Sequence, residues 1–453
     1  MGRIPARCTA SDRGGCDRVE ECRAGADVLA SGSTSTGQHL DPKLRPGLHR
    51  PPDRDHCELG RGFTLHCSEL GSERGRHTVN PSAGEAARRR RVRRLVLIIA
   101  TVLLVLPSLA LGILLTAVSP PVDDFQPRTW SPEPGLQIAN ELRSPAQVVP
   151  ITTESPYGPE DIAVDDAGVV YTGDRNGIIR RVRPDGSTER FAVVGGRPLG
   201  LAFDARQNLI VANHGEGLQS VAPDGTVTLL ADRAAGEPIR FANDLVIGSD
   251  GVVWFTDSSS RYNTTVLGDV PSYLMPDLVD GRASGRLLRY DLANGEITQV
   301  LDGLYFPNGV ALTDDEDAVW IAESTRYRIL RHTLADGLTT VIVEDLPGVP
   351  DGLNSGTDGS MLVALYDRSG ALDSLVLPTA LGRQLMIRLP NSLFVNEDDP
   401  LTGSILVLDS TGRPQHLHTG LDPAATNVVP HNERWYLGAL LGQPVRSMTV
   451  KRG

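Results

Sequence analysis

Two patterns of hydrophobic residues stand out along the chain. One is an uninterrupted apolar run, LVLIIATVLLVLPSLALGILLTAV, at residues 95–118. The other is a unit that recurs six times between residues 158 and 440: a polar or Pro/Gly start, an apolar run, a Gly/Asp/Asn turn and a second apolar run. Alternating strands joined by DG or NG turns follow, as in GIIRRVRPDGSTERFAV. Each repeat therefore predicts about four strands.

The spacing of the repeats is typical of the blades of a propeller. Equivalent positions at the start of each unit are 39, 44, 65, 43 and 75 residues apart: Glu160, Leu199, Asn243, Asn308, Asp351 and Thr426. Four-stranded units with a period of about 40–50 residues indicate a β-propeller. We therefore predict an all-β fold, a six-bladed β-propeller over residues 151–450. The 47 Gly and 32 Pro residues are consistent with many tight turns and disfavour an all-α fold.

The two long spacings predict insertions in the third and fifth blades. They correspond to residues 261–284 and 367–393, and the second contains LPTALGRQLMIRL, which has helical spacing. Long loops on a propeller rim often flank the axial site. We consider two interpretations, loops that the fold merely tolerates and loops that form a lid or face a membrane.

The apolar run at residues 95–118 has the length of a transmembrane helix. Its 24 residues include no charge, and at about 1.5 Å per residue they span roughly 36 Å, enough for a hydrocarbon core. Six arginines lie between residues 88 and 94, and the positive-inside rule places them in the cytoplasm. This predicts a single-pass membrane protein with an extracytoplasmic propeller. The alternative is a cleaved signal peptide, because Ala117 and Ser119 form a weak cleavage motif.

The remaining segments show no sustained periodicity. Residues 1–87 are rich in Arg, Gly, Ser and Asp, which predicts disorder, and residues 88–118 form the basic flank and the transmembrane helix. Residues 119–150 contain PP, RP, SPEP and SP, which predicts an extended stalk. No methionine lies between Met1 and Met275, so a mis-assigned start would require another codon, for instance at Val79, and would leave residues 1–78 untranslated.

Charge and cysteine divide the chain at the same place. Residues 1–94 contain 18 Lys and Arg against 12 Asp and Glu, and the rest of the chain contains 26 against 44. This acidic part lacks the cationic excess that nucleic acid binding requires. All five cysteines lie within the first 67 residues, and none of them forms a CxxC pair that would indicate zinc. The predicted propeller therefore needs no disulfide and no reducing compartment.

Four of the six equivalent start positions carry carboxylate or amide side chains. In a propeller the inner strands all begin at one end of the central channel, so Glu160, Asn243, Asn308 and Asp351 are predicted to converge there. Two carboxylates and two amide oxygens suit a hard cation, and Ca²⁺ fits better than Mg²⁺, which demands stricter geometry. The alternative for each residue alone is a turn, because Asn and Asp before Gly are common turn formers.

The second strand of each blade returns to the same end of the channel. His214 at one of these strand ends is a candidate general base or ligand-orienting residue, and the alternative is a structural histidine. Asp257 and Glu323 are expected to hydrogen-bond to groups that position the metal ligands. The sequence contains no GxSxG motif, so it does not support a serine nucleophile.

Several motifs in order resemble a known family. The runs FANDLVIGSDGVVWFTDSSSRY, SGRLLRYD, FPNGVALTDDED, AESTRYRI and LPGVPDGL resemble the strictosidine synthase-like and adipocyte plasma membrane-associated protein family. That family belongs with the gluconolactonase/regucalcin, diisopropyl-fluorophosphatase and paraoxonase propellers. The resemblance covers about residues 120–450 and implies a six-bladed fold. It also implies an axial Ca²⁺ held by one Glu, two Asn and one Asp, which fall on Glu160, Asn243, Asn308 and Asp351.

The resemblance implies hydrolysis of lactones, aryl esters or organophosphates. Our leading hypothesis is a membrane-anchored, Ca²⁺-dependent hydrolase of esters or lactones, in which the cation polarises the substrate oxygen and either water or Asp351 attacks. The alternatives are a non-catalytic binding propeller with structural Ca²⁺ and a strictosidine synthase-like condensing enzyme. The last is disfavoured because Thr426 stands where the condensing enzyme has its glutamate, and Glu433 is a poor substitute seven residues later.

Overall fold

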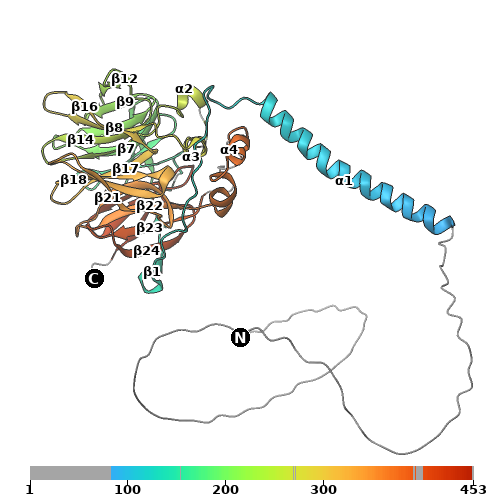
Figure 1. Ribbon diagram of the computed structural model, residues 1–453. Coiled ribbons are helices and arrows are strands. Elements are labelled where there is room, and N and C mark those ends of the chain that lie inside the picture. Colours follow the sequence, from blue (N-terminus) through green and yellow to red (C-terminus); the bar gives the residue numbers. More distant parts are fainter. Residues whose placement is uncertain are drawn as a thin grey trace, which may run out of the picture. The chain divides into compact units, whose positions relative to one another are not determined.

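The computed structural model of the chain describes residues 83–153, 155–268, 270, 272–390, 393 and 401–450. Figure 1 shows one long helix followed by a ring of β-sheets. The predictions of a disordered N-terminal region and of a mis-assigned start fall mainly on residues 1–82, outside the described residues. Residues 83–87, which we expected to be disordered, instead form the first turn of the helix.

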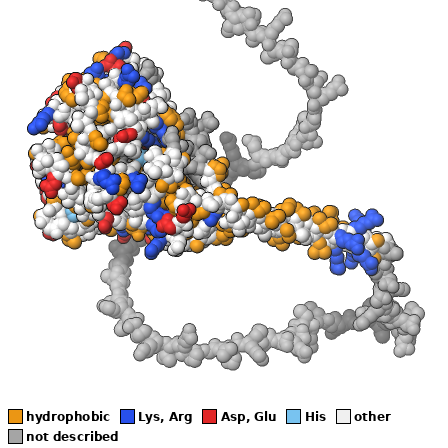
Figure 2. Space-filling model, turned by 90° about the horizontal axis from the view of Figure 1, so that it is seen from above, with side chains coloured by type: hydrophobic (Ala, Val, Ile, Leu, Met, Phe, Trp, Pro, Cys, Tyr) orange, Lys and Arg blue, Asp and Glu red, His pale blue; other side chains and the backbone are white. Residues whose placement is uncertain are grey.

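Helix α1 (Ala83–Ala117) is 35 residues long and contains the whole predicted apolar run up to residue 117. An 18-residue window within Gly84–Ala117 has a mean hydropathy of 2.7, and this is the one helix among the described residues that is long and apolar enough to cross a membrane. Pro107 does not interrupt it. Figure 2 shows the basic start of α1 and the hydrophobic surface that follows it.

The rest of the described chain forms a six-bladed β-propeller, which confirms the predicted all-β fold. The first three sheets contain β3 (Ile162–Val164), β4 (Val170–Asp174), β5 (Ile178–Val182) and β6 (Thr188–Val193); β7 (Arg197–Phe203), β8 (Leu209–His214), β9 (Gly217–Val221) and β10 (Val227–Ala231); and β13 (Ala242–Ile247), β14 (Val252–Asp257), β15 (Gly285–Asp291) and β16 (Ile297–Leu304). Neighbouring strands within each of these sheets are antiparallel.

The last three sheets complete the ring. They contain β17 (Pro307–Leu312), β18 (Ala318–Glu323), β19 (Arg328–Thr333) and β20 (Thr339–Val343); β21 (Gly348–Ser355), β22 (Met361–Asp367), β23 (Gly403–Leu408) and β24 (Pro414–Leu421); and β25 (Val428–His431), β26 (Arg434–Leu437) and β27 (Arg446–Thr449). Consecutive inner strands contact one another, and β25 contacts β3, so the ring is closed.

Two short N-terminal strands take part in the last two sheets. Strand β1 (Arg143–Pro145) pairs parallel with β24, and β2 (Val149–Pro150) pairs antiparallel with β27. The sixth blade thus takes its fourth strand from the N-terminal side of the propeller. Because both strands precede residue 151, the fold includes part of the segment that we expected to be a stalk.

The segment between α1 and η1 (Asn140–Leu142) lies along the propeller. The amides of Arg128, Trp130 and Leu136 donate hydrogen bonds to carbonyl oxygens of the propeller unit at 2.8, 3.0 and 2.6 Å. Phe125 and Ile138 are buried. The segment is extended, as its prolines predict, but it is attached to the propeller along much of its length.

The two insertions form short helices at one end of the ring. The blade 3 insertion contains α2 (Thr264–Leu267) and α3 (Leu274–Asp280), and the blade 5 insertion contains η3 (Leu372–Val376) and α4 (Ala380–Met386). Both insertions follow the second strand of their blade and therefore emerge at the end of the channel where the inner strands begin. Figure 1 shows α2, α3 and α4 gathered on one side of the propeller. The remaining short elements are β11 (Arg233–Ala234), β12 (Glu237–Pro238) and η2 (Ser324–Arg326).

Candidate active site

The structure brings the four candidate metal ligands together at one end of the channel. Glu160, Asn243, Asn308 and Asp351 all line one cavity of about 50 Å³. The Asn243 side-chain amide donates to Asn308 Oδ1 at 2.7 Å, and the Asn308 amide donates in turn to Asp351 Oδ1. The positions are therefore adjacent around the axis, as the repeat predicts. Their role as ligands stays a prediction.

Glycines allow the inner strands to come this close to one another. A side chain at Gly309 would collide with the backbone of Leu353 in the next blade, and a side chain at Gly352 would collide with Asn427. The Asn-Gly and Asp-Gly pairs at these positions lie within inner strands β17 and β21, so they are not hairpin turns. The absence of a Cβ lets the ligand-bearing strands converge.

The donor set and its electrostatics fit a hard cation. Burial raises the pKa of Asp351 well above its ordinary value, and the negative charge of Glu160 raises it further. A cation between the carboxylates would remove both penalties, and the two amide oxygens would complete an all-oxygen site. Among the described residues no group of three His, Cys, Asp or Glu side chains is arranged to hold a metal. An all-oxygen donor set of this kind suits Ca²⁺ or Mg²⁺ better than zinc, and a metal ion at this place stays a prediction.

Arg197, which our sequence analysis did not single out, is also part of this cavity. It is the first residue of β7, is 6 % exposed, and donates through a terminal guanidinium nitrogen to Glu160 Oε2. Its Nε atom is buried without a hydrogen-bond partner. The sequence could have indicated Arg197, because it lies only two residues before Leu199, the start position of the second repeat. The cavity thus contains a cation of its own beside one of the predicted ligands.

Aromatic and apolar side chains form the wall of the cavity. Phe241, Phe306 and Tyr273 line it, and Tyr273 comes from the blade 3 insertion together with Ser272 and Leu274. The insertion therefore covers the ring of polar side chains, which agrees with the lid interpretation.

Tyr366 brings a hydroxyl group to the same cavity. It is the second-last residue of β22 and hydrogen-bonds to the Asp351 carboxylate, an interaction that lowers the pKa of Asp351 and partly offsets burial. Burial raises the pKa of Tyr366 itself, and the charge of Asp351 raises it further. The phenol therefore stays protonated and can donate to the carboxylate.

His214 does not line the cavity, contrary to its predicted role as a general base. Its ring is fully buried, stacks on Phe241 with centroids 3.9 Å apart, and meets Tyr273 edge-on at 4.6 Å. Its Nε2 atom accepts the backbone N–H of Thr264 at 3.2 Å. Burial lowers the pKa of His214 to about 3, and the charge of Arg197 contributes to the shift. The ring packs beneath the insertion and is too weak a base to take a proton at neutral pH.

Asp257 and Glu323 hold the backbone just ahead of two candidate ligands. Asp257 accepts the N–H of Phe241 at 2.8 Å, two residues before Asn243. Glu323 accepts the N–H of Tyr305 at 2.7 Å, three residues before Asn308. Both carboxylates are buried in ion pairs: Asp257 with Arg286 at 2.5 Å, and Glu323 with Arg328 at 2.5 Å. Asp257 and Glu323 therefore hold the strand backbone in place and do not contact the candidate ligand side chains through these bonds.

A further set of polar side chains follows the ligand column by one residue. Asp161 accepts the N–H of Leu201 and the side-chain amide of Asn427, both at 2.8 Å, and Asp244 accepts the N–H of Val310 at 3.0 Å. These bonds join neighbouring blades. Burial raises the pKa of Asp161 to about 7. We did not predict these residues, although each directly follows a column residue in the sequence.

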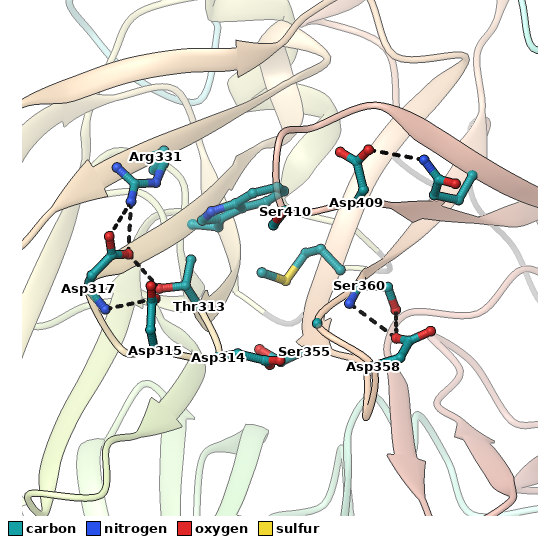
Figure 3. Close-up of a pocket in the computed structure, with 14 residues that line it drawn as sticks. Thr313, Asp314, Asp315, Asp317, Arg331, Ser355, Asp358, Ser360, Asp409 and Ser410 are labelled. Atoms are coloured by element: carbon teal, nitrogen blue, oxygen red, sulfur yellow. Dashed lines mark hydrogen bonds and ion pairs between the residues drawn. The ribbon is translucent and has the colours of Figure 1, made fainter.

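A wider hollow of about 680 Å³ lies between the fourth and fifth blades, among their strand-connecting turns (Figure 3). Several aspartates line it, but they are engaged locally: Asp317 pairs with Arg331 at 2.8 Å, and Asp358 accepts the Ser360 hydroxyl at 2.5 Å. None of the candidate ligands lines this hollow, although it is larger than the cavity of the candidate site.

Comparisons with known proteins agree with this arrangement. A family model for the SMP-30/gluconolactonase/LRE-like region matches residues 163–375. Protein STRICTOSIDINE SYNTHASE-LIKE 10 of Arabidopsis thaliana is 34 % identical over 284 residues, which cover 57 % of this chain and 74 % of the relative. The chain belongs to the strictosidine synthase-like family.

Animal members of this family are also similar to the chain. The adipocyte plasma membrane-associated protein of Gallus gallus is 31 % identical over 312 residues, covering 62 % of this chain and 73 % of that protein. Among solved structures, a gluconolactonase from Xanthomonas campestris matches with a TM-score of 0.52 and 19 % identity, over 72 % of this chain and 97 % of the other. This last similarity supports the propeller fold alone.

Proposed function

We propose that this chain is a membrane-anchored hydrolase of esters or lactones that depends on Ca²⁺ bound by Glu160, Asn243, Asn308 and Asp351. The observation that carries the proposal is the convergence of these four residues in one cavity with an aromatic wall. The match to the SMP-30/gluconolactonase/LRE-like region supports the reaction class. Hydrolysis of a lactone or ester needs a polarised carbonyl, and Ca²⁺ bound at the ring supplies that polarisation.

The chain's own residues supply the remaining chemistry. Asp351 either takes a proton from the attacking water or attacks the carbonyl carbon itself, and the Tyr366 hydroxyl orients the carboxylate. In the second route the bond from the carbonyl carbon to the alcohol oxygen breaks, and water then hydrolyses the acyl–Asp351 anhydride. Phe241, Tyr273 and Phe306 bind the apolar part of the substrate and exclude bulk water. His214 takes no part, because its buried ring does not line the cavity and stays neutral.

Two alternative functions can be tested on the same purified protein. The Arg197–Glu160 ion pair favours a propeller that binds a ligand without hydrolysing it, since a cation of the chain already neutralises one ligand. A strictosidine synthase-like condensation has less support. Thr426 is buried and donates to the carbonyl oxygen of Glu160 at 2.5 Å, and Glu433 lies beyond β25 in the turn to β26.

We further propose that α1 anchors the protein in a membrane, with the N-terminus cytoplasmic and the propeller outside. The arginines at the start of α1 support this orientation. The sequence after residue 94 is acidic overall, so we propose no nucleic acid partner.

The hydrolase proposal is tested with the full chain in detergent or nanodiscs. We expect turnover of phenyl acetate or of members of a lactone panel, loss of that turnover with a Ca²⁺ chelator, and its return when Ca²⁺ is added. Asp351→Asn should lower kcat by at least about 100-fold, whereas Asp317→Asn, in an exposed ion pair, should leave it unchanged. Turnover that survives both chelation and Asp351→Asn excludes the mechanism. Chelator-dependent stability without turnover on any substrate supports the binding propeller.

A further inference from the structure

We propose that the two insertions form a surface that lies on the outer leaflet of the membrane and that a groove in this surface takes the acyl chain of a lipophilic ester or lactone. The proposal rests on the membrane anchor and extends the proposed hydrolase function to a class of substrate. We call this surface the insertion face. It consists of α2, α3, η3, α4 and the chain that links α4 to residue 390.

Exposed apolar side chains concentrate in the blade 5 insertion. Leu375, Leu381, Leu389 and Leu393 are exposed by 68, 53, 38 and 63 %. Among the described residues after α1, no other segment of this length exposes more than two large hydrophobic side chains. Single exposed leucines are ordinary in soluble proteins, but a cluster of them marks a contact surface.

A mostly apolar groove of about 280 Å³ opens among the same elements. Its lining comes from both insertions and from the beginning of the segment that follows α1: Ser119, Pro121, Leu267, Val270, Met275, Pro276, Val279, Met386, Ile387, Arg388 and Leu389. Only Arg388 among these is charged. Such a lining fits a hydrocarbon chain better than a polar ligand.

The anchor holds this groove at the membrane surface. Helix α1 ends at Ala117, two residues before Ser119 of the groove. Arg388 also donates from Nε to the carbonyl oxygen of Val118 at 2.8 Å. Because one residue spans at most about 3.6 Å, the groove begins within roughly 8 Å of the helix end. This continuity favours lipid over a soluble protein as the occupant of the insertion face.

One segment separates the groove from the cavity of the candidate site. Val270, Met275 and Pro276 line the groove, whereas Tyr273 and Leu274, which lie between them in the sequence, line the cavity. Leu267 and Val270 also pack against the aromatic side chains of the cavity wall. Apolar contacts are therefore continuous from the groove to the ring of candidate ligands. A substrate with its acyl chain in the groove would therefore lie across this single segment from that ring.

The contact with lipid is tested on the full chain in phosphatidylcholine nanodiscs. The five native cysteines are replaced by serine, and a bimane probe is attached through Leu381→Cys. Lipids brominated on their acyl chains quench such a probe only at short range. Leu338→Cys is the matched control, because Leu338 is 57 % exposed and precedes β20 at the opposite end of the ring. Leu104→Cys, within the apolar run of α1, reports the anchor.

We expect strong quenching at positions 104 and 381 and little at 338. Quenching at 104 without quenching at 381 overturns the lipid contact and leaves the anchor intact; the insertion face then has another occupant, such as a protein. No quenching at 104 instead contradicts the anchor, and the inference fails with it.

The groove is tested with Met275→Trp, which fills it. This variant should raise KM for a dodecanoyl ester at least about fivefold and leave KM for phenyl acetate unchanged, and equal effects on both would overturn the acyl-chain assignment.

Discussion

A guanidinium group inside the candidate site sets how strongly a cation can bind there. Glu160 and Asp351 bring two carboxylates to the cavity, and Arg197 returns one positive charge to Glu160. Charges a few ångströms apart inside a protein interact by roughly 2–4 kcal/mol. Arg197 and a bound Ca²⁺ therefore repel each other, and the ion must displace the guanidinium from Glu160 or share the carboxylate with it.

Removing this guanidinium should strengthen metal binding. We expect Arg197→Met to raise the affinity for Ca²⁺ at least about tenfold, because tenfold corresponds to only about 1.4 kcal/mol. Isothermal titration calorimetry on the full chain in detergent measures the affinity directly. Arg183→Met is the matched control, since it removes the same charge from a surface ion pair with Glu189. Equal affinities in the wild-type protein and Arg197→Met would show that the ion does not bind beside Glu160.

The buried imidazole of His214 makes stability depend on pH. Its pKa falls from 6.5 to about 3 on folding because burial disfavours the charged ring. The unfolded chain therefore binds more protons below pH 6.5, so the contribution of neutral His214 is complete above that pH and is lost as the pH falls toward 3. At pH 5 the loss amounts to roughly 2 kcal/mol.

Replacing the imidazole with a ring that cannot titrate should reduce this dependence. His214→Phe retains the stack on Phe241 but cannot accept the N–H of Thr264, so it lowers stability at pH 7.5. We expect the difference in unfolding free energy between pH 7.5 and pH 5, measured in urea, to be smaller by roughly 2 kcal/mol in the variant. An unchanged difference would mean that His214 is already solvated in the folded protein.

At the scale of single elements, buried ion pairs hold the ends of the second strands. Asp257 joins the end of β14 to Arg286 of β15 and to the backbone ahead of β13. We expect Asp257→Ala to lower the unfolding free energy by about 3–5 kcal/mol, because it leaves the buried charge of Arg286 without a carboxylate. Asp317→Ala breaks an exposed pair with Arg331 and should cost less than about 1 kcal/mol. Urea unfolding of both variants decides this, and equal losses would contradict a structural role for the buried pair.

The elements also show which parts of the site the sequence could predict. The repeat places the start of every inner strand at one end of the channel, so Glu160, Asn243, Asn308 and Asp351 could be found from register alone. His214 occupies an equivalent strand end, but its direction depends on the aromatic side chains around it and on the blade 3 insertion, which interrupts the repeat. Arg197 reaches Glu160 through a long flexible side chain. Register fixes a backbone position, whereas side-chain direction depends on contacts that do not repeat.

The attachment of the N-terminal segment follows the same principle. Prolines predict an extended backbone over residues 119–150, and the structure departs from it at the turn of residues 121–124 and at η1. No local pattern indicates that Phe125 and Ile138 find buried sites on the propeller or that β2 completes the sixth blade, because these contacts join positions hundreds of residues apart. They were therefore not predictable from the segment alone.

At the scale of the whole molecule, the distribution of cysteines allows the membrane orientation to be measured without introducing new cysteines. All five cysteines precede residue 68, and the proposed orientation places them in the cytoplasm with the arginines at the start of α1. The propeller contains none. A membrane-impermeant maleimide should therefore leave the protein unlabelled in intact cells and label it after permeabilisation, while an antibody against a C-terminal tag binds in both cases. Labelling of intact cells would show that the protein has the opposite orientation. Loss of all maleimide labelling from a protein that still carries the C-terminal tag would instead indicate cleavage after the apolar run, and mass spectrometry of the tagged protein separates that outcome from a start near Val79.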